Sequence, residues 1–358
     1  MRKRIIFDVG HPAQVHNFKF VYWDLNNKGW DGLFTAKDKE VTITLLENYN
    51  LPYVILGKSG SNLFNKVIIL FFDVVKYLRI LNRYKPDIVV CRFSPHATFC
   101  SFLMGIPAIG LADTEHTKLL DHFTVPLTRA KITAKSYERS LGKNHIRFDA
   151  NIELFYLHPN RYNFPDKKYS ALDLSEGQEY VLLRFVAWHA HHDIGERGLS
   201  VIEKINLLEL LKKKYKIFIS AEGALPRELE SYRIKIPPEG MHDVIAYASL
   251  YIGEGASMAS EAACLGVTSV YINSLDAGSI KEEAKYGLLY NLRNSKDLMG
   301  VVTMLMNDDR IRLKTKNNLK RFLKGKIDPT SFLVWFIENW PESLAIMKED
   351  PKYQEKFR

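Results

Sequence analysis

The sequence predicts an α/β protein of two Rossmann-like domains, each with a parallel sheet. Short apolar segments alternate with longer helical patterns along nearly the whole chain, which is typical of parallel sheets. The length of 358 residues suffices for two separate cores. An aromatic segment with two prolines, residues 154–168, interrupts the alternation. We therefore expect one domain at residues 1–165 and another at 166–329.

Composition indicates an ordinary globular protein, with 46% hydrophobic and 25% charged residues. The three cysteines, Cys91, Cys100 and Cys264, form no CxxC pair, which favours a reducing cytoplasm. The start of the chain is too polar for a signal peptide. The most apolar run, residues 67–72, is too short to span a bilayer.

The formal net charge of +9 indicates either an anionic partner or a surface of solvated cations. The chain has no zinc finger, RNP-like aromatic motif or dense basic helix, so we do not expect it to bind nucleic acid. Nucleotide phosphates would account for a few of the charges. An anionic membrane surface would account for more of them.

The first expected strand, residues 5–9, ends in a loop that contains histidine. Gly10 and His11 follow the strand directly, and His16 lies about one turn into a helix that continues to about Lys28. Loops at the carboxyl ends of parallel strands are where open α/β folds bind ligands. Because imidazole titrates near neutral pH, His11 is a candidate general base. The alternative is that His11 only hydrogen-bonds to loop carbonyls.

An acidic cluster follows a later strand of the first domain. Asp113, Glu115 and His116 lie at the end of the strand expected at 107–113, where they could orient a substrate or transfer protons. A metal site is the alternative, but no second set of ligands with firm spacing supports it. The other strands expected in this domain are 33–36, 53–56, 86–91, 131–134 and 146–149.

A long helix is expected at residues 63–84, with more apolar side chains than one buried stripe requires. It also carries or adjoins five basic residues, namely Lys66, Lys76, Arg79, Arg83 and Lys85. One interpretation is a helix buried between its neighbours. The other is a patch that contacts a membrane surface.

The second domain is expected to begin with a strand that ends at Arg184. The loop after it contains His189, His191 and His192, which suggests a metal site or a phosphate site. The phosphate site is favoured, because the loop follows the first strand of a parallel sheet. Further strands are expected at 216–220, 248–252 and 269–272, and the chain is expected to be helical from residue 281 onward.

The most informative stretch, residues 251–266, combines a strand end, a Gly-Glu-Gly turn and a helix. Small residues at such a turn let a ligand approach the backbone, and the helix start offers unpaired N–H groups to an anion. Glu261 lies at the margin of the buried face of this helix, where a carboxylate needs a partner such as a sugar hydroxyl. The alternative is a simple turn, with Glu261 only interacting with the helix dipole.

The spacing in this stretch resembles the nucleotide-sugar signature of GT-B glycosyltransferases, which have two Rossmann-like domains. The similarity is greatest to the peptidoglycan N-acetylglucosaminyltransferases that make lipid II. In that family a Gly-Ala turn is followed by a ribose-binding Glu and then by a second Gly. Gly255, Glu261 and Gly266 keep both intervals, whereas Glu254 and Thr268 depart from the family pattern.

Two further resemblances extend beyond this stretch. The order of residues from His189 to Gly195 is loosely similar to a loop of UDP-GlcNAc 2-epimerases. The His-Pro-Ala loop at 11–13, combined with the later motif, resembles a group of predicted glycosyltransferases. These families imply two domains facing a central cleft, with residues 330–358 crossing back to the first domain.

Taken with the residues above, the resemblance implies a set of site residues. The implied catalytic residues are His11 and Glu115. The implied acceptor-side residues are Gly10, His16, Asp113 and His116. The implied donor-binding residues are Arg184, His189, Gly255, Ala256, Ser257, Met258, Glu261 and Asp276.

The implied activity is transfer of a sugar from a nucleotide-sugar donor, such as a UDP-sugar, to a glycan or lipid-linked acceptor in cell-surface polysaccharide synthesis. Such an enzyme would work in the cytoplasm or peripherally on the inner face of the cell membrane. We expect no metal and no organic cofactor, because GT-B enzymes generally need none. Two alternatives remain open: a UDP-sugar 2-epimerase-like enzyme, and a sugar-nucleotide-binding subunit without turnover.

Overall fold

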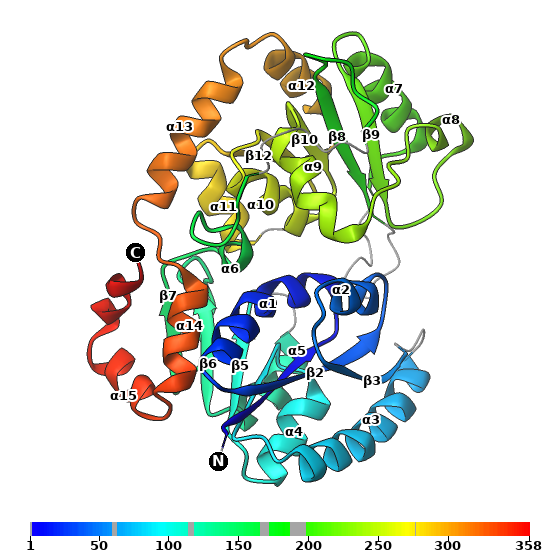
Figure 1. The fold of residues 1–358 in the computed structure, drawn as a ribbon. Helices are drawn as coiled ribbons and strands as arrows, with labels where there is room; N and C mark the ends of the chain where they lie inside the picture. Colours follow the sequence, from blue (N-terminus) through cyan, green and yellow to red (C-terminus); the bar gives the residue numbers. More distant parts are fainter. Residues whose placement is uncertain (1, 59–62, 114–117, 165–171, 187–197, 276) are drawn as a thin grey trace. The chain divides into compact units, whose positions relative to one another are not determined.

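The chain forms two compact units, each with its own sheet. The structure, a computed structural model, describes residues 2–58, 63–113, 118–164, 172–186, 198–275 and 277–358. Unit 1 comprises Met1–Arg161 and Lys326–Arg358, and unit 2 comprises Tyr162–Gly325. Every strand pair in the described ranges is parallel. The predicted α/β class with two parallel sheets is confirmed (Figure 1).

Unit 1 contains a seven-stranded sheet with the order β3-β2-β1-β4-β5-β6-β7. Each strand predicted from the sequence of this unit is present. The chain moves outward from β1 in both directions, so the strand order reverses between β1 and β4, where such sheets bind ligands. The strands are β1 (Arg4–Val9), β2 (Asp31–Asp38), β3 (Tyr53–Lys58), β4 (Ile88–Cys91), β5 (Ala108–Ala112), β6 (Ala130–Ala134) and β7 (His145–Phe148).

Helices cover both faces of this sheet (Figure 1). One layer contains α1 (Pro12–Asn27), which packs against α2 (Thr42–Asn48), α6 (Leu154–Leu157) and α14 (Pro329–Glu338). The other layer contains α3 (Leu63–Tyr84), α4 (Pro95–Leu103) and α5 (Lys118–Thr124), with α4 packed against both of its neighbours. Right-handed crossovers in opposite directions from β1 and β4 place the two sets of helices on opposite faces.

The C-terminal segment of unit 1 is held by a partly buried ion-pair network. The Arg161 guanidinium donates to Asp328 at 2.8 Å, to Asp24 at 2.7 Å and to the Ser331 hydroxyl at 2.7 Å. Asp328 also caps α14 by accepting the backbone N–H groups of Thr330 and Ser331. Beyond α14, unit 1 ends with α15 (Glu342–Glu349) and the 3-10 helix Pro351–Phe357. The network therefore joins α1, the chain after α6 and the returning segment.

Unit 2 contains a five-stranded sheet with the order β12-β11-β10-β8-β9. The strands are β8 (Tyr180–Phe185), β9 (Lys216–Ala221), β10 (Leu250–Gly253), β11 (Ser269–Ile272) and β12 (Leu289–Leu292). The helices are α7 (Val201–Leu211), α8 (Arg227–Glu230), α9 (Met241–Tyr247), α10 (Ala256–Cys264), α11 (Gly278–Lys285), α12 (Leu298–Met306) and α13 (Ile311–Leu323).

Strand β12 corrects the expectation that the chain is helical from residue 281 onward. Helix α11 ends at Lys285, and Gly287 then adopts a φ of 71°, a left-handed conformation that ends helices at little cost for glycine. The next residues pair with β11 from Leu289 to Leu292. Helical structure resumes only with α12.

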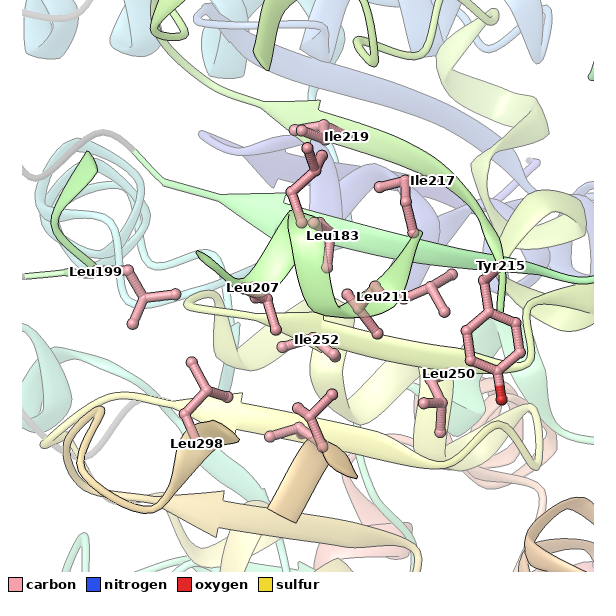
Figure 2. Packing of buried hydrophobic residues seen from close by; sticks show 14 of the residues in the cluster. Leu183, Leu199, Leu207, Leu211, Tyr215, Ile217, Ile219, Leu250, Ile252 and Leu298 are labelled. Atoms are coloured by element: carbon pink, nitrogen blue, oxygen red, sulfur yellow. The ribbon is translucent and has the colours of Figure 1, made fainter. Parts of the chain in front are cut away.

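The core of unit 2 lies between its sheet and α7 and α12. Leu207 and Leu211 of α7 are fully buried against strand residues such as Leu183 and Ile252 (Figure 2). The start of α7 is fixed by a capping box, in which Ser200 and Glu203 satisfy each other's backbone N–H groups. The sheet of unit 2 thus packs on a continuous apolar layer formed with α7 and α12.

Replacing Arg161 with Ala should destabilise the protein, because Asp328, which is 2% exposed, would keep a buried charge without its partner. We expect a loss of about 3 kcal/mol in the free energy of unfolding, measured by urea denaturation. The control is Lys28→Met, which removes a surface ion pair with Glu338 at 2.9 Å and should cost less than about 1 kcal/mol. Equal losses in the two variants would contradict the importance of the buried network.

Candidate functional site

The turn between β10 and α10 presents backbone N–H groups at the carboxyl edge of the unit 2 sheet. Gly255 is the N-cap residue of α10 and has an extended backbone, with no side-chain hydrogen bond to the cap among the described residues. Ala256 and Met258 are half-buried, and Ser257 is exposed. Among the described residues no side chain caps the first N–H groups of α10, and such groups favour an anion.

Gly253, the last residue of β10, cannot be replaced by a larger residue without displacing its neighbours. A Cβ atom at this position would lie 2.9 Å from the Cβ of Arg184 and still closer to the hydroxyl of Tyr251. The absence of a side chain lets β8 and β10 approach closely at the edge where the turn begins.

Glu261 is buried and lies beside a histidine of the preceding helix. Its Oε1 is 3.2 Å from Nε2 of His242 on α9, and the two residues are 6% and 5% exposed, respectively. The sequence predicted a carboxylate at the margin of the buried face that needs a partner. His242 supplies a partner within unit 2, whereas the predicted contact with a ribose stays a prediction.

Glu254 has a role that the sequence did not indicate. Its carboxylate is 1% exposed and accepts the backbone N–H of Val186 at 3.0 Å and of Leu199 at 2.7 Å. These two residues lie near the two ends of the segment that joins β8 to α7. The Glu254 carbonyl accepts a hydrogen bond from the Asn273 amide after β11 at 3.0 Å. Glu254 therefore holds together the chain segments that leave three adjacent strands.

The side chain of Arg184, near the end of β8, extends toward β9. Its guanidinium donates to the Ser220 hydroxyl at 2.7 Å and to the Glu222 carboxylate at 2.6 Å. A phosphate that binds Arg184 would have to share it with Glu222. The other predicted donor-binding residues of this edge, His189 and Asp276, lie outside the described residues, as do His191 and His192.

A buried polar cluster lies at the carboxyl edge of the unit 1 sheet. Asp8, at the end of β1, accepts hydrogen bonds from the Thr35 hydroxyl at 2.7 Å and from the Ser94 hydroxyl. Nε2 of His96 lies 3.0 Å from the Asp8 carboxylate. Burial raises the pKa of Asp8, but the charge of His96 and hydrogen bonds from His96, Ser94 and Thr35 outweigh it and hold this pKa below its ordinary value.

Sequence analysis missed this cluster because its members are single polar residues in separate segments. Asp8 lies at the end of an apolar strand, Thr35 belongs to β2, and Ser94 and His96 follow β4. The available signal was an acidic residue in an otherwise apolar strand, which requires hydrogen-bond partners when it is buried. The cluster lies at the point where the strand order reverses, directly before the loop that contains His11.

His11 is the N-cap residue of α1. Its Nδ1 accepts the backbone N–H of Ala13 at 3.3 Å, and its Nε2 is 3.7 Å from a carboxylate oxygen of Glu40. Gly10 donates its backbone N–H to the Gln14 side chain at 2.6 Å. When Nδ1 accepts a hydrogen bond, the proton of the neutral imidazole lies on Nε2. In this arrangement His11 is a capping residue, and a role as a base requires the ring to rearrange.

The remaining acceptor-side candidates are held by protein contacts. His16 is buried, with its ring centre 5.3 Å from that of Tyr156 and its Nδ1 3.4 Å from the Tyr49 hydroxyl. Asp113 pairs with Arg92, which also donates to the Asn17 side chain. Thus Asp113 is brought toward α1, whereas His16 packs among aromatic rings. Glu115 and His116 lie outside the described residues.

Two features are absent from the residues that the structure describes. Within them, His, Cys, Asp and Glu side chains form no group of three or more that could hold a metal ion. No described helix combines the length and the apolar character needed to cross a membrane.

Comparison with known proteins places the chain in a family. Residues 3–326 match the family described as "Protein of unknown function (DUF354)". The chain belongs to the DUF354 family. A relative from Methanocaldococcus jannaschii, "Uncharacterized protein MJ0665", is 23% identical over 276 residues, which cover 74% of this chain and 80% of the relative.

Solved structures show the fold that this DUF354 protein shares with other proteins. UDP-GlcNAc 2-epimerase from Neisseria meningitidis bound to UDP-GlcNAc matches with a TM-score of 0.66 and 13% identity, over 90% of this chain and 98% of that chain. The SsfS6 glycosyltransferase of Streptomyces sp. SF2575 matches with a TM-score of 0.61 and 14% identity, over 94% and 100%. The DUF354 protein therefore has a GT-B-like fold, which it shares with enzymes that use nucleotide sugars.

Replacing Glu254 with Gln should weaken the attachment of the segment between β8 and α7, since an amide nitrogen cannot accept the N–H that one carboxylate oxygen accepts. We expect a loss of about 1–3 kcal/mol in the free energy of unfolding and faster hydrogen exchange at Val186 and Leu199. The control is Glu203→Gln, because Glu203 accepts the backbone N–H of Ser200 at 2.7 Å in an exposed position. Unchanged exchange at both amides would refute this role.

The Asp8 cluster should make the stability of unit 1 depend on pH. The pKa of Asp8 is lower in the folded protein than its ordinary value of 3.8, so its ionised form stabilises the fold above that pH, and the contribution is lost as the pH falls further. The difference in unfolding free energy between wild type and Asp8→Asn should therefore be largest above about pH 4 and shrink at lower pH. Urea denaturation across this range measures it.

The control for this experiment is Asp87→Asn. Asp87 is exposed and accepts the backbone N–H of Arg4 at 2.7 Å, so its replacement should cost little at any pH. A difference between wild type and Asp8→Asn that is independent of pH would mean that shape, rather than charge, is what Asp8 contributes.

Proposed function

We propose that this DUF354 protein is a nucleotide-sugar-dependent glycosyltransferase. It would transfer a sugar from a donor such as a UDP-sugar to a glycan or lipid-linked acceptor in cell-surface polysaccharide synthesis, at the cytoplasmic side of the membrane. The observation that carries the proposal is the start of α10. Within the described ranges its N–H groups have no side-chain cap, they follow a central parallel strand, and Glu261 lies further along the same helix.

The chemistry of this edge suits a nucleoside diphosphate. The N–H groups after Gly255 would bind the diphosphate and lower the cost of its departure as an anion. Arg184 and the loop that contains His189 would contribute positive charge, and Asp276 would contact the donor sugar. Glu261 would accept hydrogen bonds from ribose hydroxyls while its carboxylate stays in contact with His242.

The acceptor would be activated from unit 1. His11 or Glu115 would take the proton of the acceptor hydroxyl, and the site would operate without a metal or an organic cofactor. If His11 is the base, its ring must first release the N–H of Ala13, so that a nitrogen lone pair faces the acceptor. Acceptor binding and loss of the α1 cap would then be coupled.

A 2-epimerase-like activity is the second candidate. The similarity to UDP-GlcNAc 2-epimerase, with a TM-score of 0.66, supports it. Both candidates require the same diphosphate site, but an epimerase changes the donor sugar itself and needs no acceptor. A subunit that binds sugar nucleotides without turnover is the remaining alternative.

One experiment separates these functions. The protein is incubated with uridine, thymidine and guanosine diphosphate sugars, with and without a membrane and glycan extract, and the products are analysed. Nucleoside diphosphate released only with the extract supports transfer, whereas a sugar epimerised without the extract supports the second candidate. Binding without any product indicates a binding subunit. Failure to bind any sugar nucleotide would refute the proposal.

Replacing Glu261 with Gln should weaken sugar-nucleotide binding by about 10- to 100-fold, because a charge-assisted hydrogen bond to ribose contributes about 1.5–3 kcal/mol. Isothermal titration calorimetry measures the affinity. His242→Gln is the matched control, since it disturbs the same buried pair and leaves the carboxylate in place. If His242→Gln weakens binding as much as Glu261→Gln, the pair supports the fold and Glu261 does not contact the ligand.

A further inference from the structure

The layer of α3, α4 and α5 exposes an unusual number of large apolar side chains. Among the residues whose burial is described, nine of them are more than a third exposed, and Phe71, Phe72 and Phe123 are about two-thirds exposed. On the helices that cover the opposite face of the same sheet, Val41, the N-cap of α2, is the one large apolar residue exposed to this degree in the described ranges. The nine residues are Ile68, Phe71, Phe72, Phe99, Phe102, Leu103, Met104, Leu120 and Phe123.

These residues form adjoining stripes on the outer side of the layer. On α4, Phe99, Phe102 and Leu103 recur at helical spacing, and on α5 Leu120 and Phe123 do the same. Helix α4 packs against both α3 and α5 (Figure 1), so the exposed residues of the three helices belong to one layer. We call this surface the α3–α5 face.

The exposed apolar residues are not needed to hold the helices on the sheet. Other side chains of the same helices, Tyr77 and Leu81 on α3 and Ala97 and Cys100 on α4, are fully buried and form the core cluster with β4. The outer stripe of α3 is therefore additional to its packing. A helix buried between neighbours, one of the two interpretations of its sequence, does not describe α3.

The outer stripe of α3 changes from apolar to cationic along the helix. Lys76, Arg79 and Arg83 continue the line of Ile68 and Phe72 at spacings of three and four residues, and all three are exposed. No described residue of these helices adds an exposed carboxylate. The two acidic residues of the three helices are buried and paired, Asp73 with Lys37 and Asp121 with Arg139.

We propose that the α3–α5 face docks on an anionic lipid bilayer. Phenylalanine and leucine side chains enter the interface between headgroups and acyl chains, while a basic stripe beside them is attracted to acidic lipids. A second copy of the chain fits less well, because the described residues of this face offer exposed basic side chains but no exposed carboxylate to pair with them. The proposal concerns binding alone and does not depend on the proposed activity.

The test measures cosedimentation of the full-length protein with lipid vesicles. Wild-type protein should bind vesicles that contain phosphatidylglycerol, bind phosphatidylcholine vesicles much less, and be released by high salt. Arg79→Glu with Arg83→Glu should weaken partitioning at least about 25-fold, since each basic residue contributes about fivefold. Phe72→Ser with Phe102→Ser should weaken it at least about tenfold.

Matched controls lie on unit 2. Lys316→Glu with Lys320→Glu removes the same charge from exposed positions of α13, and Val201→Ser with Ile202→Ser removes exposed apolar side chains from α7. Both controls should bind vesicles like wild type. Circular dichroism and thermal unfolding confirm that each variant is folded, and any variant that is not is replaced by the corresponding single substitution.

Three results would overturn the proposal. The first is absence of binding to anionic vesicles by the folded wild-type protein. The second is an equal loss of binding in the α3–α5 variants and in their unit 2 controls, which would show that net charge alone drives binding. The third is a stable dimer in analytical ultracentrifugation that Phe72→Ser with Phe102→Ser dissociates, which would assign this face to a second copy.

Discussion

In each unit a buried carboxylate lies at the end of a central parallel strand and binds the chain segments around it. Asp8 lies near the end of β1 and binds side chains from β2 and from the segment after β4. Glu254 follows β10 and binds the backbone on both sides of the segment after β8. Strands of a parallel sheet end at one edge, but the chain then leaves in several directions. A carboxylate with several lone pairs can hold these diverging segments together.

These long-range contacts explain why the polar residues at the sheet edges could not be predicted from the sequence, although the strands could. Parallel strands buried on both faces appear in the sequence as apolar runs, so β1, β8 and β10 could be located. The strand β12 has the sequence Leu-Tyr-Asn-Leu, lacks such a run and is recognised only through its pairing with β11. Edge residues depend on partners far away in the sequence, such as Asp8 and His96, and no local pattern encodes that pairing.

In the candidate site, too, the sequence could predict some features and not others. Spacing singled out Gly255 and Glu261 through its resemblance to the GT-B signature, and their role as ligand-binding residues stays a prediction. It could not indicate that His242 would lie beside Glu261, or that Nδ1 of His11 would cap α1. Both histidines make contacts within their own unit. Their chemistry thus depends on contacts that a ligand would have to exchange, and fold similarity alone does not determine which reaction follows.

Unit 1 is built from two separate parts of the chain, and this affects the order of folding during synthesis on the ribosome. Residues 162–325 form unit 2 and lie in sequence between the two parts of unit 1. Unit 2 is therefore completely synthesised before α14 emerges, although unit 1 begins at the N-terminus. Until then Arg161 has no Asp328 to pair with, and the part of α1 that packs on α14 stays uncovered. The N-terminal unit is consequently the last to have all of its residues available for folding, in contrast to the usual order for proteins that fold from the N-terminus.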